Sequence, residues 1–171
     1  MKVINLLGGP GCGKSTTASG LFYYMKLKGL KVELVREYVK DAVYEDRKIF
    51  DDQVYIFAKQ NRRQAILKNK VDWIITDSPL ILSAVYAPVN YYNSFSNLCL
   101  EAFNEYDNYN FMLNRVKKYS TIGRFHTEKQ AKGVDKKVKD FMDTNDIPYD
   151  YANGGVSGPY EIMINCGIHY V

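Results

Sequence analysis

Four glycines, a lysine and a serine fall within eight residues near the start of the chain, in the segment Gly8-Gly9-Pro10-Gly11-Cys12-Gly13-Lys14-Ser15. The segment matches the pattern G-x-x-x-x-G-K-[ST]. It follows the apolar run 3–7, and a helical pattern starts at Ser15. We therefore expect a strand, a glycine-rich turn and a helix, an arrangement that points backbone N–H groups at a phosphate.

The chemistry of such a phosphate-binding loop (P-loop) assigns a role to each end of the motif. Lys14 would reach the β- and γ-phosphates of a nucleoside triphosphate, and the Ser15 hydroxyl would ligate Mg²⁺. The backbone of the loop and of the first helical turn would surround the phosphates. The predicted nucleotide-binding residues are Gly8, Gly9, Pro10, Gly11, Cys12, Gly13, Lys14, Ser15 and Thr16.

Short apolar runs and helical patterns alternate along the rest of the chain. Further strands are expected at 32–35, 73–76 and 111–113, with a fifth, short strand after Tyr149. Helices are expected at 15–28, 51–68, 95–106 and 127–143. This alternation predicts an α/β, three-layer P-loop NTPase fold with a five-stranded parallel sheet, in a single domain spanning residues 1–171.

Two carboxylates come directly after predicted strands, at the sheet edge where ligands bind in such folds. Asp77 is expected to be the second Mg²⁺ ligand, and the alternative is that it caps the turn at Ser78. Glu37 is placed to accept the proton of an attacking hydroxyl group. A salt bridge between Glu37 and Arg36, or a lysine, explains its presence equally well.

The helix predicted at 51–68 carries Gln53, Phe57, Gln60 and Gln64 at spacings that place them on one face. Gln53 and Gln60 are predicted to bind a polar acceptor molecule. The ordinary polarity of an exposed helix is the alternative explanation.

A polar, basic segment at about 114–127 has no apolar period and is predicted to be a loop or lid. Arg115 and Arg124 bracket it and are expected to be mobile arginines that stabilise the transferring phosphate. From Arg115 to Lys139 nine basic residues face two acidic ones, a net charge of +7 in a chain of +4. This stretch favours a polyanion, either nucleotide phosphates or a nucleic acid, unless it is only a solvated helix face.

Composition excludes several other classes of protein. No apolar run approaches the roughly 20 residues that cross a bilayer. Three cysteines and two histidines are too few and too scattered for a disulfide framework or structural zinc. We expect a soluble, cytoplasmic protein without a membrane partner.

The order of these motifs resembles a family of small P-loop kinases and ATPases related to ribosylnicotinamide kinase, which includes phage nucleotide-kinase-like proteins. The similarity spans residues 3–149. The segments that carry it are the P-loop, Arg36-Glu37-Tyr38, the helix bearing Gln60, Thr76-Asp77-Ser78-Pro79 and residues 113–131 with their paired arginines.

This resemblance implies a kinase that uses ATP and Mg²⁺ to phosphorylate a hydroxyl group of a nucleoside, nucleotide or related small acceptor. Some phage members look like 5-hydroxymethyluracil DNA kinases, so a modified base within DNA is the alternative substrate, and the host cytoplasm is the expected location if the chain is phage-encoded. A third hypothesis is an ATPase or adaptor that binds nucleotide without phosphorylating another molecule.

Overall fold

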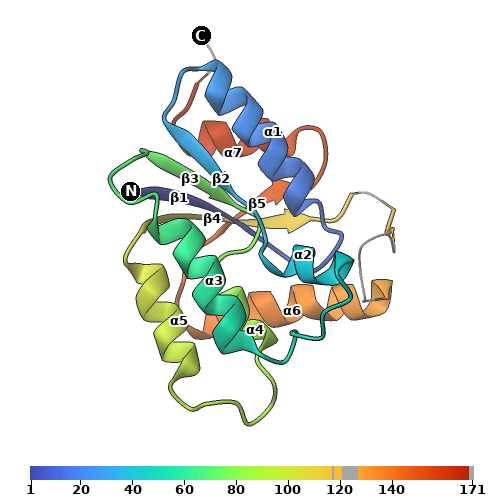
Figure 1. The fold of residues 1–171 in the computed structure, drawn as a ribbon. Helices are drawn as coiled ribbons and strands as arrows, with labels where there is room; N and C mark the ends of the chain where they lie inside the picture. Colours follow the sequence, from blue (N-terminus) through green and yellow to red (C-terminus); the bar gives the residue numbers. More distant parts are fainter. Residues whose placement is uncertain (117, 121–126, 170–171) are drawn as a thin grey trace.

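A parallel β-sheet forms the centre of the molecule in the computed structural model, which describes residues 1–116, 118–120 and 127–169 (Figure 1). The strand order is β2-β3-β1-β4-β5. The strands are β1 (Lys2–Leu7), β2 (Val32–Val35), β3 (Trp73–Thr76), β4 (Asp107–Asn114) and β5 (Asp150–Asn153). All neighbouring strands are parallel, which confirms the predicted α/β fold with a five-stranded sheet.

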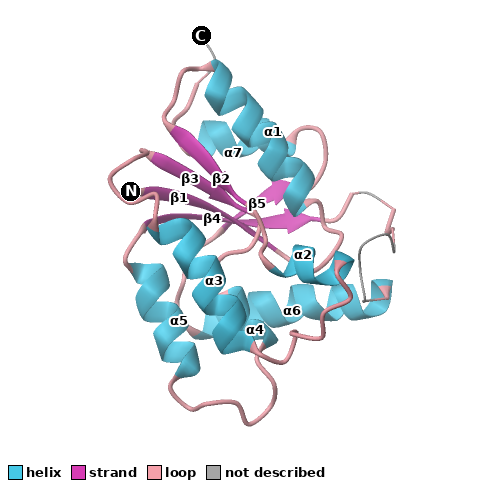
Figure 2. Ribbon diagram, viewed as in Figure 1, coloured by secondary structure: helices cyan, strands magenta, loops and turns pink. Residues whose placement is uncertain are grey.

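Helices cover both faces of this sheet (Figure 2). On one face lie α1 (Lys14–Leu27) and α7 (Gly158–Asn165). On the other lie α3 (Gln53–Ala65), α4 (Leu82–Tyr86), α5 (Phe95–Asn104) and α6 (Glu128–Thr144). The short helix α2 (Val39–Tyr44) lies beside the carboxyl ends of the strands.

Strand β1 shows how the sheet separates two apolar cores. Val3 and Leu7 pack with the helices α3 to α6, whereas Ile4 and Leu6 pack with α1 and α7. Alternate side chains of a strand point to opposite faces, so a strand covered on both sides reads as a continuous apolar run. The apolar runs of the inner strands β1 and β3 could for this reason be recognised in the sequence.

Strand β4 is longer than the predicted 111–113 because its polar first half pairs with β1. The register joins Lys2 to Asp107 and continues along both strands. The buried Asn5 amide donates to Asn108 Oδ1 at 2.8 Å and to Asn110 Oδ1 at 3.0 Å. These bonds satisfy amides that would otherwise oppose burial in a sheet.

The long helices α1, α3, α5 and α6 lie where the sequence pattern predicts them. The capping box predicted at the start of α6 is present: Thr127 Oγ1 accepts from Gln130 N at 3.3 Å, and Gln130 Oε1 accepts from Thr127 N at 2.7 Å. The helices α2, α4 and α7 were not predicted, because five to eight residues are too few to show a helical period. Among the described residues, no helix has the length and apolar character to cross a bilayer.

Candidate nucleotide and acceptor site

The P-loop connects the carboxyl end of β1 to the first residue of α1, Lys14. Gly13 has a φ of 114°, and a Cβ there would lie 2.2 Å from the carbonyl oxygen of Gly154. Only glycine fits such a position. The β5–α7 connection therefore packs against the loop and helps to set its shape.

Lys14 folds back over the loop. Its Nζ donates to the carbonyl oxygens of Gly8 at 2.6 Å and Gly9 at 3.0 Å. Burial lowers the pKa of Lys14, but interactions with Cys12, Tyr86 and nearby acidic groups outweigh burial and raise the pKa above its ordinary value. Lys14 is therefore a cation that is held against the carbonyl oxygens of Gly8 and Gly9.

Asp77 links the P-loop to the end of β2. Its Oδ2 accepts from Ser15 Oγ at 2.6 Å, and its Oδ1 accepts from the backbone N–H of Glu37 at 2.9 Å. The following turn does not use this carboxylate, because Ser78 N donates to Thr76 Oγ1 instead. The geometry thus brings Ser15, Glu37 and Asp77 together from three different segments of the chain.

The oxygens of Ser15 and Asp77 are the donor type that Mg²⁺ prefers. Within the described part of the chain no group of three or more His, Cys, Asp or Glu side chains is arranged to hold a metal ion. One carboxylate and one hydroxyl nevertheless suit Mg²⁺, since this ion keeps several waters and is commonly shared with substrate phosphates.

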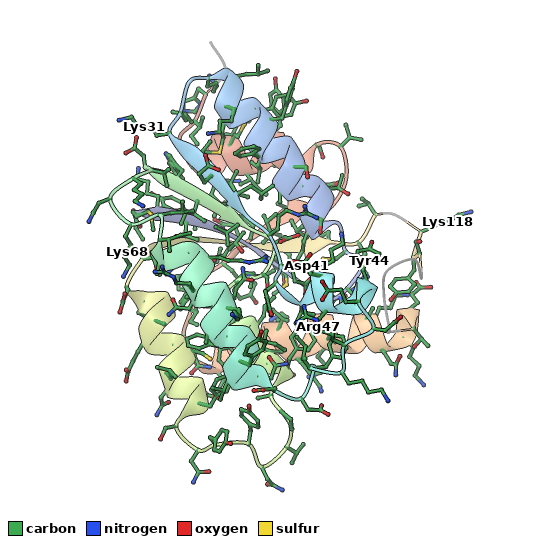
Figure 3. All side chains as sticks on the ribbon, in the orientation of Figure 1. Lys31, Asp41, Tyr44, Arg47, Lys68 and Lys118 are labelled. Atoms are coloured by element: carbon green, nitrogen blue, oxygen red, sulfur yellow. The ribbon has the colours of Figure 1, made fainter. Side chains whose placement is uncertain are left out.

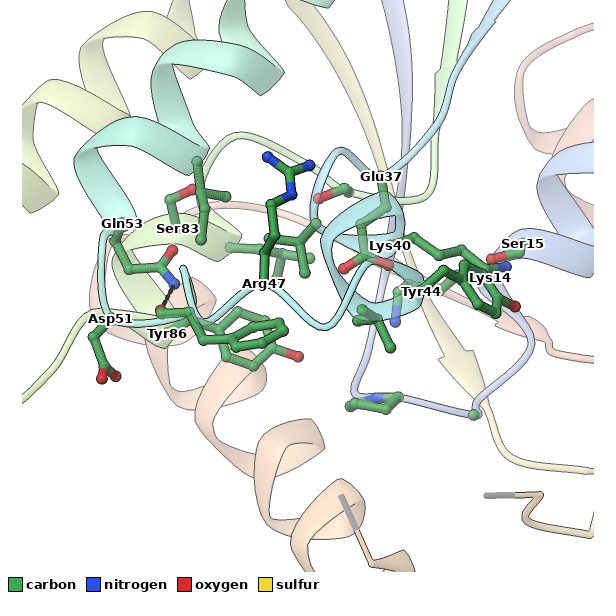
Figure 4. A pocket seen from close by; sticks show the side chains of 18 of the residues that line it. Lys14, Ser15, Glu37, Lys40, Tyr44, Arg47, Asp51, Gln53, Ser83 and Tyr86 are labelled. Carbon is green, nitrogen blue, oxygen red and sulfur yellow. Dashed lines mark hydrogen bonds between the residues drawn. The ribbon is translucent and has the colours of Figure 1, made fainter. Parts of the chain in front are cut away.

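Glu37 points into the same site, beside Lys14 and Ser15 (Figure 4). Burial raises the pKa of its carboxyl group; the charge of Lys14 opposes this shift and that of Asp77 adds to it. Among the described residues, Glu37 has no ion pair with Arg36 or with a lysine. The proton-accepting role of Glu37 stays a prediction, with its carboxyl group placed in the cavity beside Lys14.

A cavity of about 750 Å³ extends from the P-loop past Glu37 toward α3 and α4 (Figure 4). Pro10, Gly11, Gly13, Lys14, Ser15 and Thr16 line its phosphate end. The remainder, which we call the acceptor end, mixes apolar and charged side chains from α2, the α2–α3 connection, α3 and α4. Its lining includes Val39, Lys40, Val43, Tyr44, Arg47, Phe50, Asp51, Gln53, Ile56, Leu82, Ser83 and Tyr86.

The two predicted glutamines have different positions. Gln53 lines the cavity, and its Nε2 donates to the carbonyl oxygen of Phe50 at 2.6 Å. Gln60 does not line the cavity: it is buried, and its Oε1 accepts from Tyr38 N at 3.0 Å. The predicted shared helix face is present, but it turns only Gln53 toward the cavity.

Several cavity residues were not predicted as site residues. Tyr86 is on α4, and Phe50 is in the connection before α3. Tyr44 and Arg47 lie at the carboxyl end of the sheet, whereas Lys31 and Lys68 lie at its amino end (Figure 3). The sequence held one indication that these residues line a site: the segment 36–51 follows a predicted strand whose carboxyl end faces the P-loop.

Arg115 is held by neighbouring groups, which differs from the predicted mobile arginine. It forms an ion pair with Asp135 of α6 at 2.5 Å, and its Nη1 donates to Pro10 O at 2.8 Å. These acceptors fix the guanidinium against the P-loop. Arg124 and half of the predicted lid, residues 117 and 121–126, lie outside the described residues, so their arrangement stays a prediction.

Part of the charge of the basic stretch is offset by acidic residues that the +7 count did not include. On α6, Lys136 pairs with Asp140 at 2.5 Å and Lys139 pairs with Asp143 at 2.6 Å. Both aspartates follow Lys139, where the count ended. Exposed pairs four residues apart are typical of a solvated helix face.

Comparisons with known proteins agree with this architecture. Residues 3–157 match the AAA domain family. The structure is similar to the crystal structure of NadR protein in complex with NAD and AMP-PNP, with a TM-score of 0.69 and 13% sequence identity. The likeness covers 99% of this chain and 51% of that one, so this chain spans about half the length of that protein.

At 13% identity the NadR likeness establishes the fold alone. No curated protein matches the chain. The family match covers most of the sequence, including the P-loop, Glu37 and Asp77. The chain therefore belongs to the AAA domain family and has a P-loop nucleotide-binding fold.

Proposed function

We propose that this protein is a kinase that transfers the γ-phosphate of ATP to a hydroxyl group of a nucleoside, nucleotide or related small acceptor. The observation that carries the proposal is the continuous cavity between the P-loop and the acceptor end, with Glu37 between them. An ATPase without an acceptor has no need of a second compartment, lined by both apolar and charged side chains, beside the phosphates. The NadR structure, with NAD and AMP-PNP bound, supports a nucleotide-like acceptor.

The phosphate end would bind ATP through Lys14 and the P-loop N–H groups, which stabilise negative charge on the transferring phosphate. Ser15 and Asp77 would hold Mg²⁺. The ion, when bound, neutralises phosphate charge and helps to orient the triphosphate.

Glu37 would take the acceptor proton. The acceptor oxygen forms a bond to the γ-phosphorus while the bond from that phosphorus to the β–γ bridging oxygen breaks, and the hydroxyl proton passes to the Glu37 carboxylate. The products are ADP and the phosphorylated acceptor. Arg124 would approach the phosphate from the lid, whereas Arg115 would first have to leave Asp135.

The proposal is tested by measuring ADP release with nucleosides, nucleotides, nicotinamide riboside and duplex DNA containing a hydroxymethylated base. We expect one class of free small acceptor to stimulate release and to gain a phosphate, detected by mass spectrometry. Stimulation by the DNA alone would favour the DNA kinase. Nucleotide binding with no stimulation by any acceptor would favour the adaptor.

A further inference from the structure

Asp135 joins α6 to the P-loop, although neither it nor Arg115 lines the cavity. Its Oδ1 accepts from the backbone N–H of Gly9 at 2.6 Å and from Arg115 Nη2 at 3.0 Å. Its Oδ2 accepts from Arg115 Nε at 2.5 Å. One carboxylate therefore holds both a backbone group of the loop and the arginine beside it.

Arg115 extends the same connection to the next residue of the loop. Nη1 donates to Pro10 O at 2.8 Å, and Nη2 also donates to Ala131 O at 3.2 Å. With the two bonds to Asp135, these contacts use most of the five N–H donors of a guanidinium group. The guanidinium group of Arg115 is therefore bound to protein acceptors and has few N–H donors left to bind a phosphate.

The close packing of α6 on the loop supports this interpretation. A Cβ on Gly9 would lie 2.3 Å from the carbonyl oxygen of Ala131 and 3.1 Å from Arg115 Nη2. The side chains of Arg115 and Asp135 are only 17% and 28% exposed. A bidentate pair shielded in this way is stronger than a surface ion pair and defines an orientation.

We propose that Asp135 is a positioning residue that holds the start of the P-loop in its phosphate-binding form, directly through the Gly9 N–H and indirectly through Arg115 on Pro10. The inference rests on the proposed function only in that the loop binds nucleotide phosphates. A loop already fixed in its binding form loses less conformational freedom when nucleotide binds, so its affinity is higher. Arg115 also balances the charge that Asp135 brings near the phosphates.

The test is calorimetric binding of Mg²⁺–AMP-PNP and Mg²⁺–ADP to the full chain and to D135A, D135N and D140A. D135A is expected to weaken the binding of both nucleotides by about 10- to 100-fold, because the Gly9 N–H and Arg115 both lose a charged partner. D135N still presents an acceptor to Gly9 N–H, so its loss should be smaller. D140A removes an exposed aspartate from the same helix and should leave binding unchanged.

Three further readouts separate positioning from a merely structural role. The KM of the acceptor should stay constant while the nucleotide KM rises. The double variant D135A/R115A should lose little more affinity than D135A, because the two residues act as one unit. Thermal unfolding identifies any variant that fails to fold. If D135A does not fold, D135N is compared with the double variant D135N/R115A instead.

Unchanged affinity for both nucleotides in folded D135A and D135N would overturn the inference. Tighter binding of AMP-PNP alone would also overturn it, since the carboxylate would then be a competitor for Arg115. A wild-type protein that binds neither nucleotide would refute the proposed function as well, and this result is visible before any variant is made.

Discussion

The phosphate end and the acceptor end of the cavity are built in different ways. At the phosphate end, backbone groups and short hydrogen bonds from distant segments fix the polar atoms, as at Ser15 and Asp77. The acceptor end consists mainly of side chains from α2, α4 and the 45–52 connection. If the proposed function holds, phosphate recognition depends on fixed backbone geometry, whereas acceptor recognition depends on side-chain identity.

The largest expected effect is at the phosphate end. Lys14→Ala should lower kcat/KM by about 10²- to 10³-fold, because a preorganised charge on the transferring phosphate is lost. Lys40→Ala, which removes a lysine of the acceptor end, is the matched comparison. Nucleotide affinity, measured with AMP-PNP, should fall for the first variant and not for the second. Equal losses would contradict the division into two ends.

Glu37 lies at the boundary between the two ends, and Glu37→Gln should lower phosphotransfer by roughly 10²-fold, the scale of a lost general base. Burial raises the pKa of Glu37. The acidic limb of the wild-type kcat/KM profile should therefore lie above pH 4.5, the ordinary value for a glutamate. An acidic limb at the ordinary value or below, or full activity in the variant, would refute the assignment.

The same shift makes a prediction about stability. A pKa raised in the folded state favours folding below the ordinary pKa, and this contribution disappears as the pH rises through the folded-state value. Glu37→Gln should thus raise the free energy of unfolding of the ligand-free protein at pH 8, with little gain at pH 4. Denaturant titrations at both pH values measure this. Glu33→Gln, which replaces a carboxylate of β2 that lies outside the cavity and pairs with Lys26 at 3.0 Å, is the control.

The two ends also differ in how far the sequence predicts them. The P-loop, Glu37 and Asp77 were predicted as site residues because each follows a strand, and parallel strands place their carboxyl ends together. The structure places them together, while their roles remain proposals. Asp135 carried no comparable signal, since its partner Gly9 is 126 positions away and α6 reads as an ordinary charged helix.

Most lining residues of the acceptor end were not predicted from the sequence, for a different reason. Tyr86 is on a five-residue helix, and Phe50 is in an irregular connection, so neither has a periodic context that assigns it to a cavity. Arg115 was predicted to be a mobile arginine of the lid, whereas the structure binds it to Asp135, a partner that could only be found from the packing of α6 on Gly9.

At the acceptor end, Phe50→Ala should raise the KM of the acceptor about tenfold, the scale expected when an apolar contact of one aromatic ring is lost. Nucleotide affinity should not change. Tyr23→Ala, which truncates a tyrosine that is 59% exposed on α1, should leave both constants unchanged. Should Phe50→Ala weaken nucleotide and acceptor alike, the two ends would have to be treated as one site.

The smallest expected effects come from two helix N-caps, one near each end. Thr127 caps α6, which packs against the P-loop. Asp52 caps α3, which borders the acceptor end; the Asp52 carboxylate accepts from Tyr55 N at 3.1 Å. Replacing either by alanine should lower the free energy of unfolding by about 1 kcal/mol, measured by denaturant titration.

Each cap variant loses a side-chain acceptor for a backbone N–H of a first helical turn, a hydroxyl at Thr127 and a carboxylate at Asp52. Thr127→Ala loosens the turn that carries Ala131, whose carbonyl accepts from Arg115, and should weaken nucleotide binding slightly without changing the acceptor KM. Asp52→Ala should do the reverse, because Gln53 and Ile56 of its helix line the acceptor end. If both variants changed both constants, the cavity would respond as one cooperative unit, and the contrast between a fixed phosphate end and a separately built acceptor end would have to be abandoned.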